Sequence, residues 1–527
     1  MNLTARNKIV AVILGSLVTA SGVFFLFQNG PSGDDRLNGG TQGGSSSGWI
    51  NDVQVTAGGG NDSWPAMVSI GDSVFVAFSR FDSDTGYHRI SVTESKDGGL
   101  VWSQIGDFSP GLRDCMYPVM TVFNGELYVA FQYDLSSSDH DIYCYKSSPG
   151  ATGPWTGYSV RNDTNDDYRP TIDAVTIQNF AGVYVAFENR LGGTEGTDLV
   201  MSRSTGGAFS LPSTFVGAGD ASEYTTADMS VYDDQIIPAI FVAFMKLVGS
   251  QNDIYFVRSL DGGGTWSSHQ VTSSLNDEYA PSISAGYFYV LISYLIWDGD
   301  PDLYVITWNG ATFGNPYPLS ATAFIEGWPV AFNWFDNFYV VYTRGSTLTS
   351  GQLYMQSASG SANPTWGYPT TISDLDSAAD VGYSPALAIC DRPDAQLYFA
   401  ASWGDHRSGS GSSDIFYSTQ GCRYTVNTNP TGLAFIVDGV THTSEQTFNW
   451  PAGFQHTLEA PPNAIPFYCW DDGTNQWFTQ TVTPFATTSD VPGMTAFYTA
   501  IPEFAYVTIP VAGIIGIVLL SMIRRHR

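Results

Sequence analysis

The chain repeats one pattern of apolar and polar positions seven times. Each unit opens with an aromatic residue, and about 15 residues later another aromatic residue stands beside or near a proline, as in Trp64-Pro65 and Tyr117-Pro118. The fourth unit has Tyr-Thr-Thr at this place instead. The opening aromatic residues, 47 to 57 positions apart, are Trp49, Trp102, Trp155, Phe209, Trp266, Phe313 and Trp366. A fixed period of this length is the sequence signature of a repeat architecture.

Within each unit the apolar residues fall into short runs of strand length. Runs such as VFVAF, LYVAF, VYVAF and IFVAF follow the aromatic-proline position, and a further run, commonly led by an aspartate, comes after each of them. Short aromatic and β-branched runs between turn signals predict strands. Four such strands per unit of about 50 residues are typical of one blade of a β-propeller.

The register of the repeat also predicts how the ring closes. The seventh unit supplies three strands up to about Thr419, where the composition changes, and no fourth strand follows. The unmatched stretch WINDVQVT, Trp49 to Thr56, has the form of that missing strand. We therefore predict an all-β fold, with a seven-bladed β-propeller over residues 49–420 that is closed by its own N-terminal strand. Closure of this kind leaves no open blade edge.

Segments of different composition flank the predicted ring. Residues 1–29 contain an uncharged run and predict a signal peptide or an N-terminal anchor. Residues 30–48 are rich in Gly and Ser and predict a flexible linker. Residues 421–500 alternate short strands with turn signals and predict a small β-sandwich-like domain. Residues 501–527 hold an apolar run that ends in arginines, which predicts a transmembrane or sorting segment with a cytoplasmic end.

Both ends of the chain thus predict the membrane as a partner and an extracellular propeller held at the cell surface. The formal net charge of −29 argues against nucleic acid as a partner, because phosphates require Lys and Arg. None of the five cysteines forms a CxxC pair, which argues against a zinc site.

Two turns of similar sequence carry a family resemblance. SLDGGGTW (Ser259 to Trp266) and SKDGGLVW (Ser95 to Trp102) combine adjacent glycines with Ser, Asp and a following Trp. Glycines permit a tight turn, Ser and Asp can bond its backbone N–H groups, and Trp can anchor it. The pattern resembles the Asp-box (BNR) repeat of sialidase-like β-propellers. In that family the box joins the two outer strands of a blade away from the active centre, which implies a scaffold role here.

Two further resemblances concern the C-terminal part. NPTGLAFIVDG and FNWPAGFQHTL, in residues 422–500, resemble the PEGA-like β-domains of prokaryotic surface proteins, which implies a stalk or spacer. Pro502-Glu503-Phe504, followed by an apolar helix and a basic end, resembles the archaeal PEF-type sorting tail. In that family a membrane transpeptidase removes the tail and attaches the protein to a lipid. The alternative is an ordinary single-pass anchor.

The loops before the aromatic-proline positions are the predicted binding face. Each blade contributes an acidic and an aromatic residue to these loops, which in a propeller surround one end of the central channel. Aromatic faces stack on sugar rings or hold cations, and carboxylates accept hydrogen bonds from hydroxyl groups. The predicted ligand-binding residues are Asp62, Trp64, Tyr117, Asp167, Tyr168, Arg169, Tyr224, Glu278, Tyr279, Glu326 and Trp328. The alternative is that the acids bond turn backbone while the aromatic residues pack between blades.

One loop is a candidate metal site. DGDPD places Asp298, Asp300 and Asp302 at alternate positions, and carboxylate oxygens suit Ca²⁺. The alternative is a solvated acidic turn. The sequence predicts no other cofactor.

Three functions are compatible with these features. We expect a membrane-tethered binding or adhesion module whose ligand is a glycan or a surface protein. The first alternative is an extracellular sialidase-like glycoside hydrolase. Sialidases grip a carboxylate with three arginines, and the nearest match to the first arginine's motif is YRPT with Arg169, which lacks the family's Ile and lies in the third unit. The second alternative is a structural protein of the cell envelope.

Overall fold

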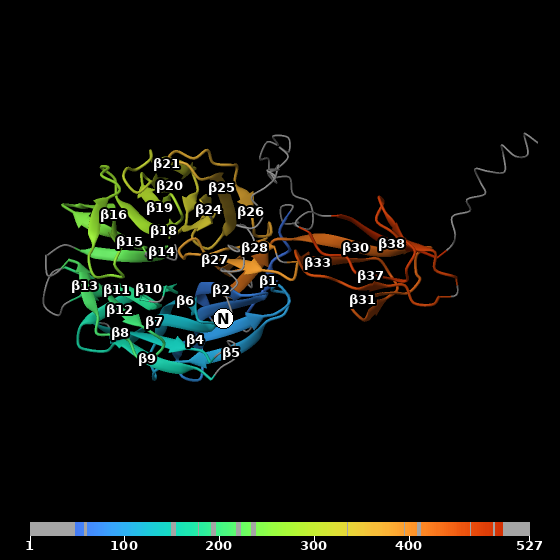
Figure 1. Cartoon of the computed structure of the whole chain (residues 1–527), viewed down its shortest axis with the longest axis horizontal. Helices are drawn as coiled ribbons and strands as arrows, with labels where there is room; N and C mark the ends of the chain where they lie inside the picture. Colours follow the sequence, from blue (N-terminus) through green and yellow to red (C-terminus); the bar gives the residue numbers. More distant parts are fainter. Residues whose placement is uncertain are drawn as a thin grey trace, which may run out of the picture. The chain divides into compact units, whose positions relative to one another are not determined.

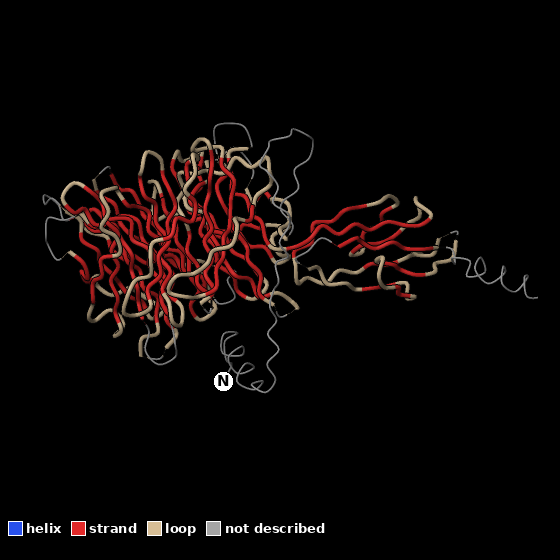
Figure 2. Tube along the Cα trace, turned by 90° about the horizontal axis from the view of Figure 1, so that it is seen from above, coloured by secondary structure: helices blue, strands red, loops and turns tan. Residues whose placement is uncertain are grey.

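The computed structural model describes residues 48–56, 61–136, 138–148, 154–177, 179–190, 196–217, 223–232, 239–334, 336–394, 396–407, 413–463, 465–487 and 491–498. These residues form strands, turns and loops, and no helix occurs among them (Figure 2). The predicted all-β fold is therefore confirmed. No described residue belongs to a helix that could cross a membrane. The predicted terminal segments 1–29 and 501–527 lie outside the described residues.

Seven antiparallel sheets account for residues 53–419, and we call them blades 1 to 7. Blade 1 consists of β2 (Ser63–Ile70), β3 (Ser73–Asp82), β4 (Tyr87–Ser95) and β5 (Ser103–Phe108). Blade 2 consists of β6 (Cys115–Phe123), β7 (Glu126–Ser136), β8 (Asp139–Lys146) and β9 (Thr156–Arg161). Blade 3 consists of β10 (Asp166–Val175), β11 (Gly182–Arg190), β12 (Asp198–Ser204) and β13 (Ser213–Val216). Blade 4 consists of β14 (Tyr224–Tyr232), β15 (Ala239–Val248), β16 (Gln251–Ser259) and β17 (Ser267–Gln270).

Blade 5 repeats this order, and blades 6 and 7 vary it. Blade 5 consists of β18 (Glu278–Ala285), β19 (Val290–Trp297), β20 (Pro301–Trp308) and β21 (Tyr317–Ser320). Blade 6 has a divided inner strand and consists of β22 (Ile325–Glu326), β23 (Val330–Trp334), β24 (Asn337–Gly345), β25 (Gly351–Ser359) and β26 (Thr370–Thr371). Blade 7 consists of β27 (Ala386–Asp391), β28 (Leu397–Asp405), β29 (Asp414–Thr419) and the N-terminal strand β1 (Val53–Gln54).

The blades follow one another around a common centre (Figure 1). Each blade is hydrogen-bonded to the next, and the seventh to the first. The bonds run from Ser79 Oγ to Cys115 O (2.6 Å), Arg169 N to Gln132 Oε1 (3.1 Å), Met229 N to Thr171 Oγ1 (3.1 Å), Ile283 N to Asp228 Oδ2 (2.9 Å), Ala331 N to Ser282 Oγ (3.1 Å), Ala379 N to Gly351 O (2.8 Å) and Ser69 Oγ to Ile389 O (2.5 Å). This is the arrangement of a β-propeller.

Short polar side chains connect the innermost strands of blades 3 to 6. An inner strand has a ladder partner on one side only, so alternate N–H groups face the channel without a strand to accept them. Met229 N–H donates to Thr171 of the preceding blade, and Val231 N–H donates to Asp173 Oδ2 (2.8 Å). Ser230 in turn accepts from the Ala285 N–H (3.0 Å). The same relation links blade 5 to blade 6, where Ser284 accepts from the Asn333 N–H.

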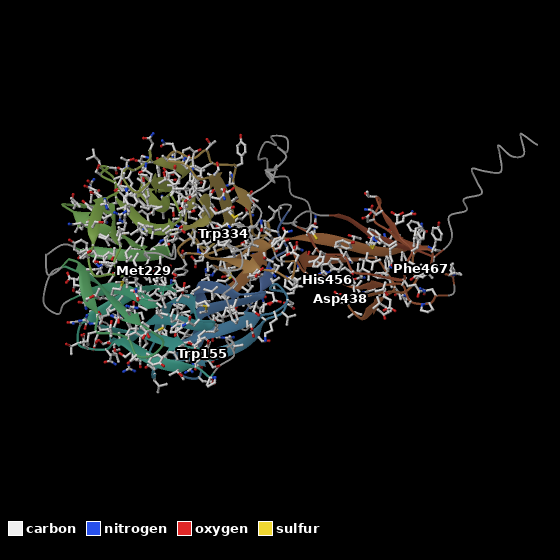
Figure 3. The ribbon with its side chains drawn as sticks, viewed as in Figure 1. Trp155, Met229, Trp334, Asp438, His456 and Phe467 are labelled. Carbon is white, nitrogen blue, oxygen red and sulfur yellow. The ribbon has the colours of Figure 1, made fainter. Side chains whose placement is uncertain are left out.

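Bulky aromatic residues fill the outer gaps between blades. Trp155, labelled in Figure 3, lies before β9 and donates its indole N–H to Ile105 O of blade 1 (2.9 Å). Its ring lies 5.0 Å from that of Phe108. The opening aromatic residue of this unit therefore seals the boundary between blades 1 and 2, which explains why the repeat requires a large ring there.

The two glycine-rich turns share one hydrogen-bond pattern. In the second turn, Gly263 N–H donates to Ser259 Oγ (2.8 Å), Thr265 N–H donates to Asp261 Oδ1 (2.8 Å), and Trp266 Nε1–H donates to Gly263 O (3.1 Å). The first turn repeats these bonds with its own Ser, Asp and Trp. They join β4 to β5 and β16 to β17, the two outer strands of their blades, so both turns are scaffold.

The predicted closure strand is present. Val53 and Gln54 pair with Tyr417 and Phe416 of β29, so β1 is the outer strand of blade 7. That ladder is only two residues long. Polar contacts of the neighbouring Asp52 add to the attachment of this strand. The backbone N–H of Asp52 donates to Asp374 Oδ2 (3.0 Å), and the N–H of Asp374 donates back to Asp52 Oδ2 (2.9 Å). Arg407 then bonds Asp52 (2.5 Å) and Asp405 (2.8 Å).

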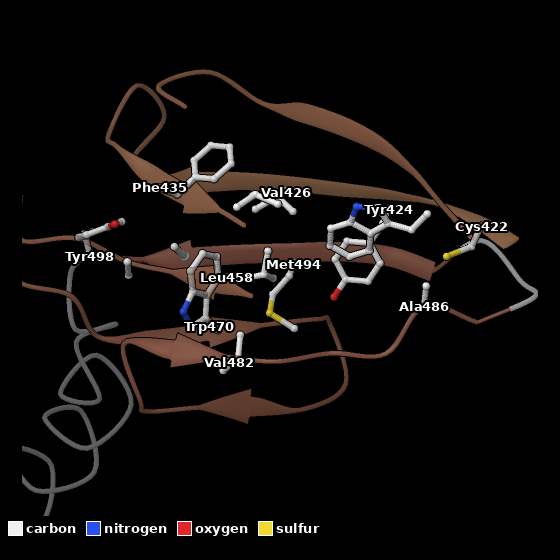
Figure 4. Close-up of a cluster of buried hydrophobic side chains, with 14 residues drawn as sticks. Cys422, Tyr424, Val426, Phe435, Leu458, Trp470, Val482, Ala486, Met494 and Tyr498 are labelled. Atoms are coloured by element: carbon white, nitrogen blue, oxygen red, sulfur yellow. The ribbon is translucent and has the colours of Figure 1, made fainter. Parts of the chain in front are cut away.

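The remaining strands form two small sheets that share one core. The first contains β30 (Gly421–Asn429), β33 (Gln446–Pro451), β35 (Cys469–Asp471), β36 (Gln476–Trp477) and β38 (Val491–Phe497). The second contains β31 (Phe435–Val437), β32 (Val440–His442), β34 (Leu458–Glu459) and β37 (Thr481–Val482). Side chains from both, among them Val426, Phe435, Leu458, Trp470 and Met494, pack together (Figure 4). This is the packing expected of a β-sandwich.

We predict that removing the closure strand destabilises the ring. A protein that begins at Gly58 lacks β1 and leaves the β29 edge unpaired, so its Tm should fall by several degrees and its tendency to aggregate should rise. A protein that begins at Gly48 is the matched control, and differential scanning calorimetry is the measurement. Equal melting temperatures for the two would contradict the closing role of β1.

Candidate functional site

A β-bulge recurs near the start of the inner strand in blades 1 to 5. In each, the pairing register shifts at the aromatic-proline position or its counterpart. One residue of each bulge has a positive φ: Trp64 (51°), Tyr117 (52°), Arg169 (43°), Thr226 (54°) and Ala280 (50°). Non-glycine residues rarely adopt this left-handed conformation, and a bulge that holds one redirects its side chain. In blades 1 to 5 the repeated motif therefore redirects one side chain at the same end of the inner strand.

Aromatic side chains from three blades converge at this end of the inner strands. The Trp64 ring of blade 1 lies 4.7 Å from the Tyr117 ring of blade 2. It also lies 4.8 Å from the ring of Tyr383, which precedes β27 in blade 7. All three side chains are partly exposed. Burial, together with the nearby Asp380 and Tyr117, raises the pKa of the Tyr383 hydroxyl. We call Trp64, Tyr117 and Tyr383 the aromatic mouth.

Arg169 is the redirected residue of blade 3. Its side chain is 45% exposed, and its Nη1 lies 3.7 Å from Oε1 of the buried Glu188 in β11. The same oxygen accepts a hydrogen bond from the Thr226 N–H of blade 4 (2.6 Å). Burial raises the pKa of Glu188 to about 7, although Arg169 and the Thr226 N–H act in the opposite direction. A carboxyl of this kind exchanges its proton near neutral pH, where both of its forms are populated.

The predicted acidic residues lie beneath the surface. Asp62, Asp167, Glu278 and Glu326 are each at most 1% exposed. Burial raises the pKa of all four, to about 7 for Asp167 and Glu326. Their partners are local: Arg80 lies 3.9 Å from Asp62, Asn189 donates to Asp167, Thr272 to Glu278, and Ser320 and Thr322 to Glu326. Contact of these carboxyls with a ligand stays a prediction.

The other predicted aromatic residues lie between or within blades. Tyr168 contacts the His140 ring at 5.0 Å and bonds Asp166. Tyr224 is buried beside Phe244, at 5.8 Å between ring centroids. Tyr279 and Trp328 are partly buried against the apolar core of blades 5 and 6. Of the predicted aromatic residues, the structure thus brings only Trp64 and Tyr117 together.

The predicted calcium loop does not form a metal-ligand group. Asp298, Asp300 and Asp302 are all described, and the described part of the chain contains no group of three or more His, Cys, Asp or Glu side chains placed to hold a metal ion. Asp302 lies in β20, while Asp298 lies in the turn that precedes this strand. Ca²⁺ binding by this loop therefore stays a prediction, and the arrangement of the described residues does not support it.

Glu188 was not predicted; it stands in the apolar run VYVAFEN. Tyr383, in the YSP motif of the seventh unit, is the rim-loop aromatic residue of that unit, although it was not among the residues predicted to bind the ligand. A charged residue inside a run that must be buried is itself a signal, because buried charges require partners or a shifted pKa.

No protein-family model matches the chain, and no curated protein matches it. Among solved structures, it is similar to the GH93 α-L-arabinofuranosidase of Fusarium graminearum in complex with arabinobiose, at 13% identity and a TM-score of 0.43, over 71% of this chain and 98% of that one. It is also similar to the α-L-arabinanase of Penicillium chrysogenum, at 10% identity and a TM-score of 0.43, over 72% and 98%.

A protein of unknown function from Dyadobacter fermentans matches at 14% identity and a TM-score of 0.40, over 59% of this chain and 98% of that one. These TM-scores lie below 0.5, so the likeness carries no conclusion about function.

We predict that the protein becomes more stable as the pH falls from 8 to 6. Asp52, Asp167, Glu188 and Glu326 have pKa values raised to about 7, whereas those of an unfolded chain lie near 4. The native state therefore holds protons that the unfolded chain releases, so the stabilisation is complete below about pH 4 and is lost as the pH rises through 7. Tm should rise by several degrees between pH 8 and pH 6.

Glu326→Gln should flatten this dependence, since an amide can accept the Ser320 and Thr322 hydroxyl bonds without ionising. Asp72→Asn, at an exposed turn, is the matched control. A Tm that increases with pH, or a Glu326→Gln profile identical to the parent profile, would contradict the assignment.

Proposed function

We propose that this protein is a carbohydrate-binding β-propeller and that its ligand docks at the aromatic mouth. The observation that carries the proposal is the convergence of Trp64, Tyr117 and Tyr383 from three blades, two of them held in left-handed bulges. A tilted cluster of partly exposed rings offers faces for a sugar ring, and the tyrosine hydroxyls offer polar contacts at its edge. Display at the cell surface is part of the proposal and depends on the predicted terminal segments.

The net charge of the protein favours a neutral ligand. The chain has 50 acidic and 21 basic residues, so an anionic sugar meets net repulsion. Arg113 bonds Leu135 O and the Tyr87 hydroxyl, whereas Arg169 lies beside Glu188. These two arginines thus have partners within the protein, which disfavours a sialidase-like grip on a ligand carboxylate.

We predict that Trp64→Gly weakens binding of a neutral glycan at least ten-fold. Glycine adopts a φ of 51° without strain, so the variant removes the ring while the bulge survives and Tm stays close to that of the parent. A glycan array identifies the ligand and isothermal titration calorimetry measures the loss.

Tyr368→Ala is the matched control, because this tyrosine is 93% exposed and lies outside the mouth. Unchanged affinity in Trp64→Gly, or equal losses in both variants, would refute a binding role for the mouth.

Glycoside hydrolysis is a second candidate function, favoured by Glu188. Its raised pKa, near 7, would let it donate a proton to a leaving group at neutral pH, and the exposed side chain of Arg169 lies beside it. A hydrolase needs a second carboxylate about 5 to 9 Å from the first. Among the described residues, the contacts of Glu188 are with Arg169 and the Thr226 N–H and not with a second carboxylate, so this candidate ranks second.

If the protein is a hydrolase, release of nitrophenol from neutral aryl glycosides should disappear in Glu188→Gln, whereas the control Glu445→Gln should keep it. We expect no release from any glycoside tested, including arabinosides and sialosides. Turnover that Glu188→Gln abolishes would replace the binding proposal by the hydrolase.

A further inference from the structure

A cleft of about 250 Å³ lies between blades 3 and 4, apart from the aromatic mouth. Residues from five strands or their ends line it: Phe215, Val216, Tyr224, Phe244, Lys246, Tyr255, Val257, Trp266 and Ser268. Five of the nine are aromatic. Ligand pockets in proteins typically measure 300 to 1,000 Å³, so this one suits a single ring rather than an oligosaccharide.

The aromatic walls come from both blades. Phe215 of β13 stacks with Trp266, which precedes β17, at 4.7 Å between ring centroids and an interplanar angle of 28°. Tyr255 of β16 stacks with Phe244 of β15 at 6.2 Å. Trp266 is also the anchor of the second glycine-rich turn, whose hydrogen bonds fix the ring from outside the cleft. The walls are therefore held in place without a ligand.

Lys246 is the only basic residue that lines the cleft. Its Nζ lies 5.1 Å from the centroid of the Tyr224 ring and 5.7 Å from that of Tyr255, so two aromatic faces hold the ammonium group. Asp253 stands opposite Lys246 in the β15–β16 ladder, but its Oδ2 accepts a hydrogen bond from Gln270 (3.0 Å).

Lys246 also differs from the other lysines that the structure describes. Lys96 pairs with Glu94 at 3.3 Å, and Lys146 pairs with Glu126 at 3.0 Å. Within the described residues no carboxylate lies within 4.0 Å of the Lys246 ammonium group, although acids outnumber bases more than two to one in the chain. An ammonium group that aromatic faces orient in this way can still donate to an anion, since cation–π contact leaves its N–H groups available.

We propose that this cleft binds a carboxylate carried on a saturated ring, the chemistry of a uronic acid. The carboxylate pairs with Lys246, and the apolar face of the ring stacks on the aromatic walls. The site is separate from the neutral-sugar site proposed for the mouth, and only the choice of a sugar as the ring rests on that proposal. An acidic protein thus keeps one place where an acidic sugar is attracted rather than repelled.

The test measures binding of methyl α-D-galacturonide to the full chain, with methyl α-D-galactoside as the neutral probe. Calorimetry or saturation-transfer NMR should show saturable binding of the galacturonide and at least ten-fold weaker binding of the galactoside. Lys246→Gln should reduce galacturonide affinity at least ten-fold, and Lys246→Arg should retain most of it. Lys96→Gln removes the same charge at an exposed position and is the matched control, which should bind like the parent.

Two further variants separate this inference from its alternatives. Ser268→Trp places a large side chain on the exposed β17 wall and should block the cleft even if Lys246→Gln proves unstable. Trp64→Gly, which alters the mouth, should leave galacturonide binding unchanged, so failure of the mouth proposal and failure of this one are distinguishable. No galacturonide binding by the parent, or binding that survives both Lys246→Gln and Ser268→Trp, would overturn the proposal.

Discussion

The backbone N–H groups on the channel edge of the innermost strands need hydrogen-bond acceptors, and this demand determines how neighbouring blades are joined. Such a strand has a neighbour on one side, and its other edge faces the channel, where no strand of the same blade can pair with it. In blades 4 to 6 the preceding blade meets the demand with side chains: Thr171, Asp173 and Ser230, and likewise Ser284, accept backbone N–H groups of the next inner strand. Each of blades 3 to 5 therefore fixes the position of the next blade along the channel axis.

The same demand explains where the candidate site can form. Proline has no N–H group, so an inner strand can bulge at Pro65 or Pro118 without leaving a donor unsatisfied. The residue before the proline then takes a left-handed conformation, and its side chain turns away from the ladder. In blades 1 and 2, scaffold and site thus follow from one short motif: the proline leaves no unsatisfied donor at the break in the ladder, and the preceding residue supplies an aromatic side chain. Blade 4 forms the same bulge at Thr226 without a proline.

The sequence specified the strands better than the directions of side chains. The period of the aromatic residues predicted seven sheets, and the unmatched WINDVQVT predicted the strand that pairs with β29, because both depend on spacing along the chain. The burial of the acidic residues in the rim loops was harder to predict. Glu223 and Glu326 both stand near the start of an inner strand, yet Glu223 is exposed and Glu326 is buried under Ser320 and Thr322. Loop conformation decides between them, and local sequence does not encode it clearly.

Partners brought together from different blades were also beyond prediction. Glu188 occupies the position that Gln132 has in blade 2 and Met245 in blade 4, two residues after the alanine of each VAF run. Only the arrangement of blades 3 and 4 around the ring shows that its carboxyl meets both Arg169 and the Thr226 N–H. Tyr383 likewise joins Trp64 only because the last blade lies beside the first.

Closure by the N-terminal strand sets the order in which this protein can be completed during synthesis. Thr56 bonds Ile415, which is 359 residues later, and Ile50 accepts from Ser418, which is 368 residues later. The first strand to leave the ribosome is therefore the last to find its partner, and contacts of such long range form slowly. While the chain grows, blades 1 to 6 can assemble in sequence, but the segment from Trp49 to Thr56 must wait as an unpaired strand. The ring therefore stays open during synthesis, and this strand must avoid other pairing partners until residue 419 has been made.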